Sequence, residues 1–559
     1  ILKGRGNYIC LNRLFDLEYR SKELINNLEC HDIAAIIAWS YYTKSGDIDE
    51  CGSFSLNQNN RLWNLLKSDV KFCSKNCFSS SCFYTDLCIS IKEADIIVVN
   101  HSVFALDAIE NRNLLPFQKY FVIDEAHDFF KSTKKILTSE FDKLFFKNHL
   151  DDILILIKSL SVDSKEINLL NNLIEHSATQ FDSFFNSYMQ SKNIINNEPS
   201  NYPSINSFQD VNIEFQDCNP SISNLIDNLN EIIINVNLID EGYVDFKLIK
   251  KSGLLDLLYR FSDAINSFIK CINSDSYISW SKYHHRSNYA SINFLPKDIG
   301  RIVSQNCFEN SNIGIFCSAT ITVDSSFEYF KSQLGLDRLS YSRNLSEHIF
   351  ETPFLLEEQV SFYSFKSDLH INSDEYIENI SNQIYEISLS FDKKMLVLCT
   401  SYRQASQIKD RLSPKFKTLN KKLLVHEKGR SRNSLIRAFK ESKNSILVGT
   451  MAFWEGVDLP GDELSILMMI RIPFSNPSDP YLKYLDNELN IKGKNGFSDY
   501  QVPQACIKMK QGFGRLIRTE YDSGIFIITD PRIYNSSYGN IIINSFPIES
   551  VQYTRISEI

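Results

Sequence analysis

Residues 121–127 read Phe-Val-Ile-Asp-Glu-Ala-His, so a short apolar run ends in two adjacent carboxylates. The run predicts a strand, and a carboxylate at the carboxyl end of a parallel strand faces the ligand crevice. Asp124 is therefore a candidate for holding a hydrated Mg²⁺ bound to nucleotide phosphates. Glu125 is a candidate for orienting and deprotonating an attacking water, and His127 for linking the site to a neighbouring segment. Adjacent acids also occur in solvated loops, and the preceding apolar strand favours the catalytic interpretation.

Short apolar runs alternate with helix-like runs on both sides of this stretch, most clearly beyond residue 390. Pro503–Arg518 is predicted as a long helix that precedes the last strand. Strands that alternate with helices are typical of parallel α/β domains. The predicted strands are Ile96–Val99, Tyr120–Ile123, Ile313–Phe316, Met395–Cys399, Leu423–Val425, Ser445–Val448, Leu464–Ile470 and Ile525–Thr529.

The alternation is lost between about residues 138 and 295. Residues 140–160 have helical periodicity, with Phe141 on the apolar face. Residues 193–223 are rich in Asn, Ser and Pro, which predicts a loop. Tyr277–Trp280 and Tyr289–Phe294 are predicted to form a hairpin. The block is therefore interpreted as a helical insertion.

Length and composition agree with a multidomain globular chain. The 559 residues suggest three or four domains, at about 150 residues each. No apolar run approaches the ~18 residues of a membrane span, so no membrane partner is expected. The 59 basic and 68 acidic side chains give a net charge of −9, which excludes a wholly basic nucleic-acid coat but permits a local basic groove. Lys3, Arg5, Arg430 and Arg432 are candidates for that groove, or ordinary surface charges.

Four of the thirteen cysteines lie in one short segment, at positions 73, 77, 82 and 88. Residues 72–88 contain too few aliphatic side chains to form a core strand or helix, so a metal is the expected ordering element. The spacing alone permits zinc or an iron–sulfur cluster. The alternative is a reduced structural loop.

Residues 510–518 read KQGFGRLIR, in which Gln511, Arg515 and Arg518 are spaced by four and three. This spacing would place them near one face of a helix. Two arginines on that face can reach phosphate oxygens, one of them as an arginine finger. The alternative is a solvated basic helix face.

Residues 449–461, GTMAFWEGVDLPG, form a glycine-rich turn with acids after a strand. Glycines allow the backbone to approach a ligand closely, and Glu455 and Asp458 are candidates for coupling nucleotide to nucleic acid. The alternative is a tight loop with a buried Trp454. Hydroxyls at 318, 320, 400 and 401 end two further strands and suit phosphate contacts.

Together these segments resemble superfamily 2 helicases of the DinG/XPD group. FVIDEAH resembles motif II, and CSAT at 317–320 resembles motif III. Motifs IV, V and VI correspond to VLCTSYRQ at 397–404, ILVGTMAFWEGVDLPGDELS at 446–465 and QGFGRLIR at 511–518. ILKGRGNYIC at 1–10, VVNHSVFALDA at 98–108 and IPFSNPSDP at 472–480 are also phrases of this group.

The resemblance implies an α/β fold with two RecA-like parallel-sheet motor domains, an iron–sulfur insertion and a helical arch insertion. It implies a 4Fe–4S cluster held by Cys10, Cys77, Cys82 and Cys88. The implied domains are 1–9 (remnant of motor domain 1), 10–90 (iron–sulfur domain), 91–137 (motor domain 1 with the DEAH box), 138–295 (arch), 296–345 (return of motor domain 1 with the SAT motif) and 346–559 (motor domain 2).

The resemblance also assigns roles beyond the catalytic set of Asp124, Glu125, His127, Gln511, Arg515 and Arg518. Nucleotide coupling falls to Ser318, Thr320, Gly456 and Asp458. DNA binding falls to Asn100, His101, Thr400, Ser401 and Arg432. The expected cofactors are the 4Fe–4S cluster and Mg²⁺, with ATP as substrate.

One departure concerns the Walker A loop, G-x-x-x-x-G-K-[ST], which this sequence lacks. Its one Gly-Lys pair, Gly493-Lys494, is followed by Asn495. Without that loop the phosphates lose their backbone cradle and a lysine. Because the chain begins at Ile1, we expect an amino-terminal truncation before Walker A, and weak ATP hydrolysis by these residues alone.

The predicted function is an ATP-dependent 5′–3′ DNA helicase in DNA repair or replication-conflict resolution. Its expected partners are single-stranded DNA and forked or tailed duplexes, and the protein is expected to be a cytoplasmic bacterial monomer. One alternative is an ATPase-deficient, metal-stabilised nucleic-acid-binding protein. Another is an RNA-directed DEAH motor, which the cysteine spacing disfavours.

Overall fold

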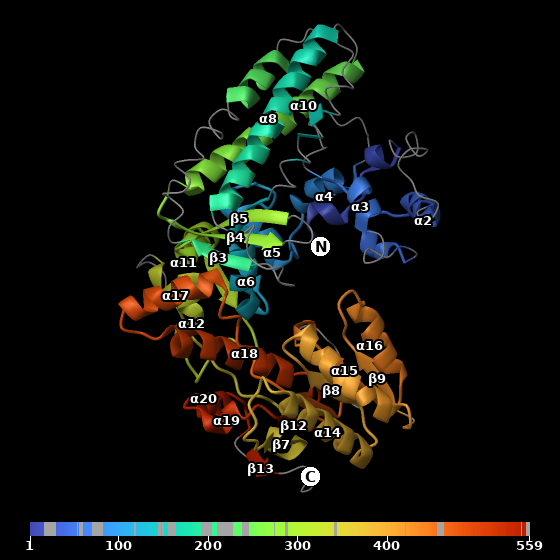
Figure 1. Ribbon diagram of the computed structural model, residues 1–559, viewed down its shortest axis with the longest axis vertical. Coiled ribbons are helices and arrows are strands. Elements are labelled where there is room, and N and C mark those ends of the chain that lie inside the picture. The colour runs from blue at the N-terminus through green and yellow to red at the C-terminus, as the bar shows by residue number, and fades with distance from the viewer. Residues whose placement is uncertain are drawn as a thin grey trace. The chain divides into compact units, whose positions relative to one another are not determined.

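The computed structural model divides into two compact units, residues 1–121 with 129–314, and residues 122–128 with 315–559 (Figure 1). Each is described by itself. The structure describes the whole chain except residues 16–29, 53, 55–59, 70–81, 117–118, 143–146, 148–149, 152, 155–163, 192–203, 209–226, 237–244, 273, 285–288, 340–343, 420, 455–462, 549–550 and 555–559.

The second unit is built on a seven-stranded sheet in which every paired neighbour is parallel. Its strand order is β13-β7-β12-β11-β8-β10-β9. The bounds are β7 (Val360–Phe365), β8 (Met395–Leu398), β9 (Lys422–Val425), β10 (Ser445–Gly449), β11 (Ile466–Met469), β12 (Gly524–Ile528) and β13 (Val551–Thr554). β8, β10 and β11 are buried at every residue, as expected for a parallel sheet covered on both faces.

Helices pack on both faces of this sheet (Figure 1). Because side chains alternate along a strand, Leu396 and Leu398 of β8 face one core while Met395 and Val397 face the other. The first core includes residues of α16 (Arg432–Glu441), α18 (Val502–Phe513) and α20 (Gly539–Asn544). The second includes residues of α14 (Asp374–Ser390) and α15 (Tyr402–Phe416).

A separate two-stranded ribbon pairs β1 (Tyr120–Ile123) with β6 (Ile313–Phe316). α5 (His101–Glu110) precedes β1, and α6 (Phe129–Leu137) follows it. Both predicted strands are confirmed. The predicted strand Ile96–Val99 is wrong, because the structure has there only an isolated bridge between Val99 and Leu2, and Ile96 is 83% exposed.

The block between β1 and β6 contains a four-stranded antiparallel sheet, order β2-β5-β4-β3, and two long helices. The strands are β2 (Ser139–Asp142), β3 (Ser204–Phe208), β4 (Tyr277–His284) and β5 (Tyr289–Pro296). The helices are α8 (Ser164–Ser191) and α10 (Asp245–Ile272), and their apolar residues share a core with Phe141, Ile292 and Phe294 of the sheet.

The predicted hairpin is confirmed, with Trp280 opposite Asn293 in the β4–β5 pair. Two predictions are wrong in part. Phe141 lies in a strand and not in a helix, because it pairs with Ile292 across β2 and β5. β3 lies inside the segment predicted as a loop, where it pairs with β4. The remainder of 193–223 lies outside the described residues.

Three helices pack together near the amino terminus, α2 (Cys30–Ser40), α3 (Asn60–Leu66) and α4 (Phe83–Ile91). Their apolar residues form a small core with Ile9, Ile48 and Phe83. Isolated bridges join Tyr8 to Asp47 and Ile9 to Lys67. Within the described part of the chain, no helix is both long and apolar enough to cross a bilayer.

Candidate functional site

The turn after β1 holds the two predicted carboxylates. The backbone of Cys317, which follows β6, makes two hydrogen bonds to this turn. Its N–H donates to Ile123 O at 3.0 Å, and its carbonyl accepts from Ala126 N at 3.0 Å. The Asp124 carboxylate accepts from Glu125 N at 2.9 Å. Glu125 has φ 47°, in the left-handed region. Such a conformation costs on the order of 1–3 kcal/mol and persists where surrounding contacts hold it, often at functional sites.

His127 joins the acid-bearing turn to the segment after β6. Its Nδ1 lies 2.7 Å from Ser318 Oγ and 3.3 Å from Thr320 Oγ1. The same Nδ1 lies 3.3 Å from Glu125 Oε2, and Ser318 Oγ donates to that oxygen at 3.3 Å. The imidazole is buried at 7% exposure, whereas the Glu125 side chain is 63% exposed. The structure therefore brings four predicted residues into one cluster, with the carboxylate open to solvent.

Cys317 contributes a thiol beside the acids. Although the residue as a whole is exposed, partial desolvation and the neighbouring Asp124 carboxylate raise the pKa of this thiol. It is therefore protonated at neutral pH, and its Sγ lies 3.7 Å from Asp124 Oδ1 and 3.6 Å from Ile123 O. The thiol acts as a weak donor that helps to hold the carboxylate.

The prediction of one helix face for Gln511, Arg515 and Arg518 is wrong. α18 ends at Phe513, with Gly514 as its C-cap, and the next residues turn through bonds from Arg515 N to Gly512 O and Leu516 N to Phe513 O. Glycine is a poor helix former and a common helix terminator. Gln511 thus lies in the helix, while both arginines follow it. Gln511 is 8% exposed, and within the described part of the chain its Oε1 has no hydrogen-bond partner.

Hydroxyl and amide groups gather where β8 ends. Thr400 Oγ1 donates to Gln404 Oε1 at 2.8 Å, and Ser401 caps α15 by accepting from Gln404 N at 3.2 Å. Gln404 is 4% exposed, and its Nε2 has no hydrogen-bond partner among the described residues. Ser401 thus has a structural task as a helix cap.

His426, which follows β9, was not predicted as a site residue. Its Nδ1 lies 2.7 Å from Thr450 Oγ1, at the end of β10. The ring lies between those of Tyr402 and Phe453, with centroids 5.1 and 4.9 Å away. Burial, aided by the charge of Arg432, lowers the pKa of His426. The rule that placed candidates directly after strands would also have found this histidine.

The other predicted DNA-binding residues are placed as follows. Arg432 begins α16, with its guanidinium 5.9 Å from the Phe453 ring centroid. Asn100 caps α5 through a bond from Val103 N at 2.8 Å. His101 packs edge-on against Phe129, with the ring centroids 5.5 Å apart. Asn100 and His101 thus have structural contacts of their own, and their role in DNA binding stays a prediction.

Three of the four predicted cluster ligands are described. Cys10 donates its backbone N–H to Leu66 O, Cys82 is the N-cap residue of α4, and Cys88 lies inside that helix. Burial raises the pKa of the Cys88 thiol. Cys77, Gly456 and Asp458 lie outside the described residues. In the described ranges no three His, Cys, Asp or Glu side chains are grouped as a metal site.

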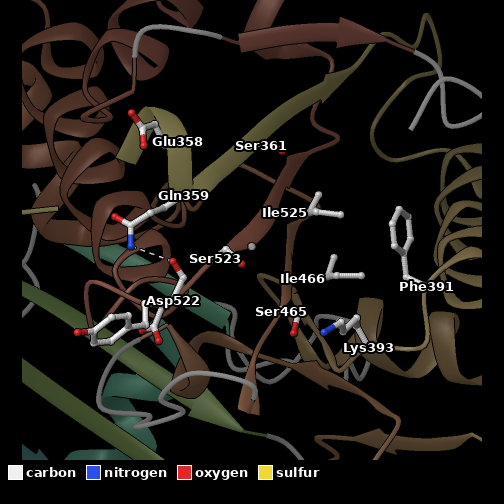
Figure 2. Close-up of a pocket in the computed structure, with 12 residues that line it drawn as sticks. Glu358, Gln359, Ser361, Phe391, Lys393, Ser465, Ile466, Asp522, Ser523 and Ile525 are labelled. Atoms are coloured by element: carbon white, nitrogen blue, oxygen red, sulfur yellow. Dashed lines mark hydrogen bonds between the residues drawn. The ribbon is translucent and has the colours of Figure 1, made fainter. Parts of the chain in front are cut away.

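A hollow of about 480 Å³ lies at the amino ends of β7, β11 and β12. Figure 2 shows Ser361, Ser465 and Ser523 around it, with Lys393 and Phe391 on one side. Gln359 closes the other side by donating to the carbonyls of Thr519, Glu520 and Asp522. In a parallel sheet, ligands bind at the carboxyl ends of strands, so this hollow is separate from the predicted site.

Comparison with known proteins places this geometry in a class. A protein-family model described as the helicase C-terminal domain matches residues 384–549. The ATP-dependent DNA helicase YoaA of Escherichia coli (strain K12) is 25% identical over 564 residues, which cover 98% of this chain and 81% of that protein. The 3′-5′ exonuclease DinG of Bacillus subtilis (strain 168) is 26% identical over 597 residues, which cover 100% of this chain and 62% of that protein.

Two solved structures share the fold. One, titled XPD helicase, aligns with a TM-score of 0.51 and 17% identity over 85% of this chain and 76% of its own. The other, Xpd4 of S. tokodaii, aligns with a TM-score of 0.50 and 16% identity over 82% of this chain and 83% of its own.

A parallel α/β unit that matches a helicase C-terminal domain, together with a strand that ends in Asp-Glu-Ala-His, defines a helicase-type protein. Within that class, the matched domain and the relatives named YoaA and DinG support a DinG/XPD-like helicase. The resemblance inferred from the motifs and the predicted α/β helicase fold are confirmed. The iron–sulfur insertion, the domain boundaries and the roles of single residues stay predictions.

Proposed function

We propose that this protein is an ATP-dependent DNA helicase that moves 5′ to 3′ on single-stranded DNA. The cluster of Glu125, His127, Ser318 and Thr320 is the observation that supports the proposal most directly. It sets an exposed carboxylate against buried polar partners at the carboxyl ends of β1 and β6, where a nucleotide phosphate is expected. Relatives that cover 98% of the chain carry the name ATP-dependent DNA helicase.

In this proposal Asp124 holds Mg²⁺ through the hydration shell, since carboxylate oxygens are the ligands that Mg²⁺ prefers. The exposed Glu125 carboxylate accepts a proton from the attacking water. His127 and Ser318 fix its orientation from the buried side. Gln511 and the arginines after α18 supply donors for the γ-phosphate, where a developing charge needs compensation.

DNA contact is proposed for the carboxyl ends of β8 and β9. Thr400 and Ser401 offer hydroxyls there, and Arg432 offers a guanidinium. Such groups bind phosphates whatever the base sequence, so affinity should fall steeply with salt. Single-stranded DNA and tailed or forked duplexes are the proposed substrates, with roles in repair or replication conflicts.

A 4Fe–4S cluster is proposed on Cys10, Cys77, Cys82 and Cys88. The proposal is supported by the packing of Tyr8 against Tyr84, with centroids 5.8 Å apart and planes tilted by 50°, because it places the segment before Cys10 beside the helix that carries Cys88. Four thiolates are the usual ligands of this cluster, which would order the surrounding segment when bound. An anaerobic preparation should be brown, with iron and sulfide near four each, and Cys88→Ser should lose the colour. A colourless protein that contains zinc would contradict the assignment.

Strand displacement tests the helicase proposal. The product of the complete gene should open a 5′-tailed duplex in the presence of ATP and Mg²⁺, and leave a blunt duplex closed. Opening of 3′-tailed substrates alone would contradict the proposed direction. Absence of DNA-stimulated ATPase activity would contradict the proposed motor.

A second function is favoured by one observation, the lack of a G-x-x-x-x-G-K-[ST] loop in these 559 residues. A chain without that phosphate cradle would bind nucleic acid without turning over ATP. For this alternative, salt-sensitive DNA binding remains while the gene's whole product shows no ATPase activity. The same two assays therefore separate the two functions.

A further inference from the structure

Lys510 makes a hydrogen bond that the functions above do not use. It lies in α18, one residue before Gln511, and its Nζ donates to the Thr322 carbonyl at 3.1 Å. Thr322 follows Thr320 of the cluster by two residues. The bond therefore joins the segment that leaves the acid cluster to the helix that carries Gln511, although the two residues are 188 positions apart.

A charged lysine at position 510 carries a desolvation cost. Burial lowers the pKa of Lys510, opposed by the nearby Cys506 and Asp324. A half-buried ammonium loses part of its hydration and needs a partner in return. Cys506 and Phe513, four residues before it and three after it on α18, are buried and apolar, so an apolar side chain would suit the same face of the helix. The charge is therefore best explained by the bond that it makes.

A hydrogen-bonded turn follows the acceptor of this bond. Val323 and Ser326 exchange both backbone hydrogen bonds, Val323 N to Ser326 O at 3.1 Å and Ser326 N to Val323 O at 3.0 Å. Between them, Asp324 and Ser325 have φ of 50° and 57°. These values define a tight hairpin turn of the I′ kind, which non-glycine residues adopt only at a cost. Val323 anchors the turn in the apolar core that includes α18.

A second contact holds the same segment a few residues later. Tyr329 of α12 (Glu328–Leu334) packs on Tyr500 of η10 (Phe497–Gln501), with centroids 5.7 Å apart. Gln333 Nε2 donates to the Tyr329 hydroxyl at 2.8 Å. Since η10 runs directly into α18, the segment after Thr320 is fixed to this helical layer at two points. A shift of the acid cluster would therefore be passed to Gln511.

We propose that Lys510 is a positioning residue that couples the Glu125–His127–Ser318–Thr320 cluster to Gln511 through the Thr322 carbonyl. It touches neither nucleotide nor metal in this role. Its loss should lower the rate of ATP hydrolysis and weaken the stimulation by DNA, while ATP affinity stays unchanged. The inference rests on the proposed function.

The test compares Lys510→Met with Lys510→Arg and with Lys508→Met. Methionine keeps the bulk and removes the donor, arginine keeps the donor, and Lys508→Met removes one cation from the same helix at a position turned about 200° away. A hydrogen bond to a charged group contributes about 1.5–3 kcal/mol, so kcat of Lys510→Met should fall about tenfold to a hundredfold. KM for ATP should stay within about twofold, because positioning acts on the chemical step.

A second readout does not depend on ATP turnover. Hydrogen–deuterium exchange of residues 318–326 should be faster in Lys510→Met than in the wild type, and unchanged in Lys508→Met. Lys510→Arg should restore both kcat and protection in large part. If Lys510→Met does not fold, Lys510→Gln serves in its place, since it is polar and too short to reach Thr322.

The outcomes separate this inference from the proposed function. An inactive wild-type enzyme would overturn the function, and the exchange of residues 318–326 would still decide whether Lys510 holds them. An active wild type with an equally active Lys510→Met would overturn the coupling. A rise in KM with unchanged kcat would make Lys510 a nucleotide-binding group and would also overturn it.

Discussion

Two strand systems carry the candidate site residues, and they are supported very differently. In the seven-stranded sheet, β8, β10 and β11 are buried at every residue. In the β1–β6 ribbon, by contrast, Val122 is 65% exposed, and Ile313 and Ile315 are 55% and 52% exposed. The acids thus stand on a ribbon with one open apolar side, whereas His426 and Thr450 stand on a sheet enclosed on both faces.

The covered side of the ribbon explains how it holds its shape. Phe121 packs between Phe104 and Phe308, with centroid distances of 5.7 and 5.5 Å. Gly314 provides the space, because a Cβ there would lie 2.2 Å from Phe121 Cζ. Support for Asp124 and Glu125 therefore comes from one aromatic layer and from the polar bonds to the segment after β6. The predicted catalytic acids lie on the exposed ribbon, whereas the buried core lies in the seven-stranded sheet. Substitutions can therefore test activity and stability separately.

The largest effect is expected at the ribbon's carboxylate. Glu125→Gln keeps the shape and the backbone turn and removes the proposed base. General base catalysis contributes about 10²–10⁴-fold, so kcat for DNA-stimulated ATP hydrolysis should fall by that factor. Because the side chain is 63% exposed, the melting temperature should hardly change. Full activity in Glu125→Gln would remove this residue from the mechanism, and DNA binding by the variant serves as its control.

A matched pair of valines compares the two systems directly. Val397 of β8 is fully buried, whereas Val122 of β1 is 65% exposed. Val397→Ala should lower the free energy of unfolding by about 2–3 kcal/mol, through lost burial and a cavity. Val122→Ala should change it by no more than about 0.5 kcal/mol. Urea denaturation followed by circular dichroism measures both, and an equal cost at the two sites would refute the contrast.

The ribbon's covered face should behave like a core despite its open side. Gly314→Ala places a methyl group against the Phe121 ring, which Phe104 and Phe308 prevent from moving away. Overpacking of this kind costs about 1–3 kcal/mol. Thermal melting should show the loss, and Phe121→Leu in the same chain should recover part of it. A stable Gly314→Ala variant would mean that the aromatic layer is loose.

Sequence patterns predicted the central strands well because each is a short continuous apolar run between breakers. Ile96–Val99 has the same pattern, yet only Val99 pairs, since a run of apolar residues does not reveal whether a neighbouring strand exists. β3 was missed because its Asn- and Ser-rich residues pair only through the long-range partner β4. The apolar pattern of a segment depends only on residues close in sequence, whereas strand pairing depends on a partner that can be far away in the chain.

The site was predictable to a similar extent. Glu125, His127, Ser318 and Thr320 were found from strand ends and do come together, and Asp124 accepts from the backbone N–H of Glu125. The arginines were placed on a helix that stops at Gly514, where C-capping prevails over the i, i+4 spacing. Lys510 was seen only as part of a basic run, because the carbonyl that it contacts lies 188 residues away. The spacing of residues within a motif cannot reveal a partner so far away in the sequence.

The smallest expected effect is a change in the pH dependence of stability caused by His426 of the enclosed sheet. Burial, aided by Arg432, lowers the pKa of His426, and the ring meets Thr450, Tyr402 and Phe453. The unfolded chain, with a histidine pKa of about 6.5, then binds more protons than the folded one as pH falls. This contribution to stability is therefore complete above about pH 6.5 and is lost as pH falls from there through the lowered folded pKa.

His426→Gln should remove that loss, so the variant's melting temperature should decline less than the wild type's between pH 7.5 and 5.5 at constant ionic strength. His348→Gln is the control, because His348 is exposed and stacks on Phe350. It should keep the wild-type slope. An unchanged slope in His426→Gln would mean that the imidazole is protonated in place, with Nδ1 still donating to Thr450, and that the enclosed sheet tolerates a charge which its apolar surroundings should disfavour.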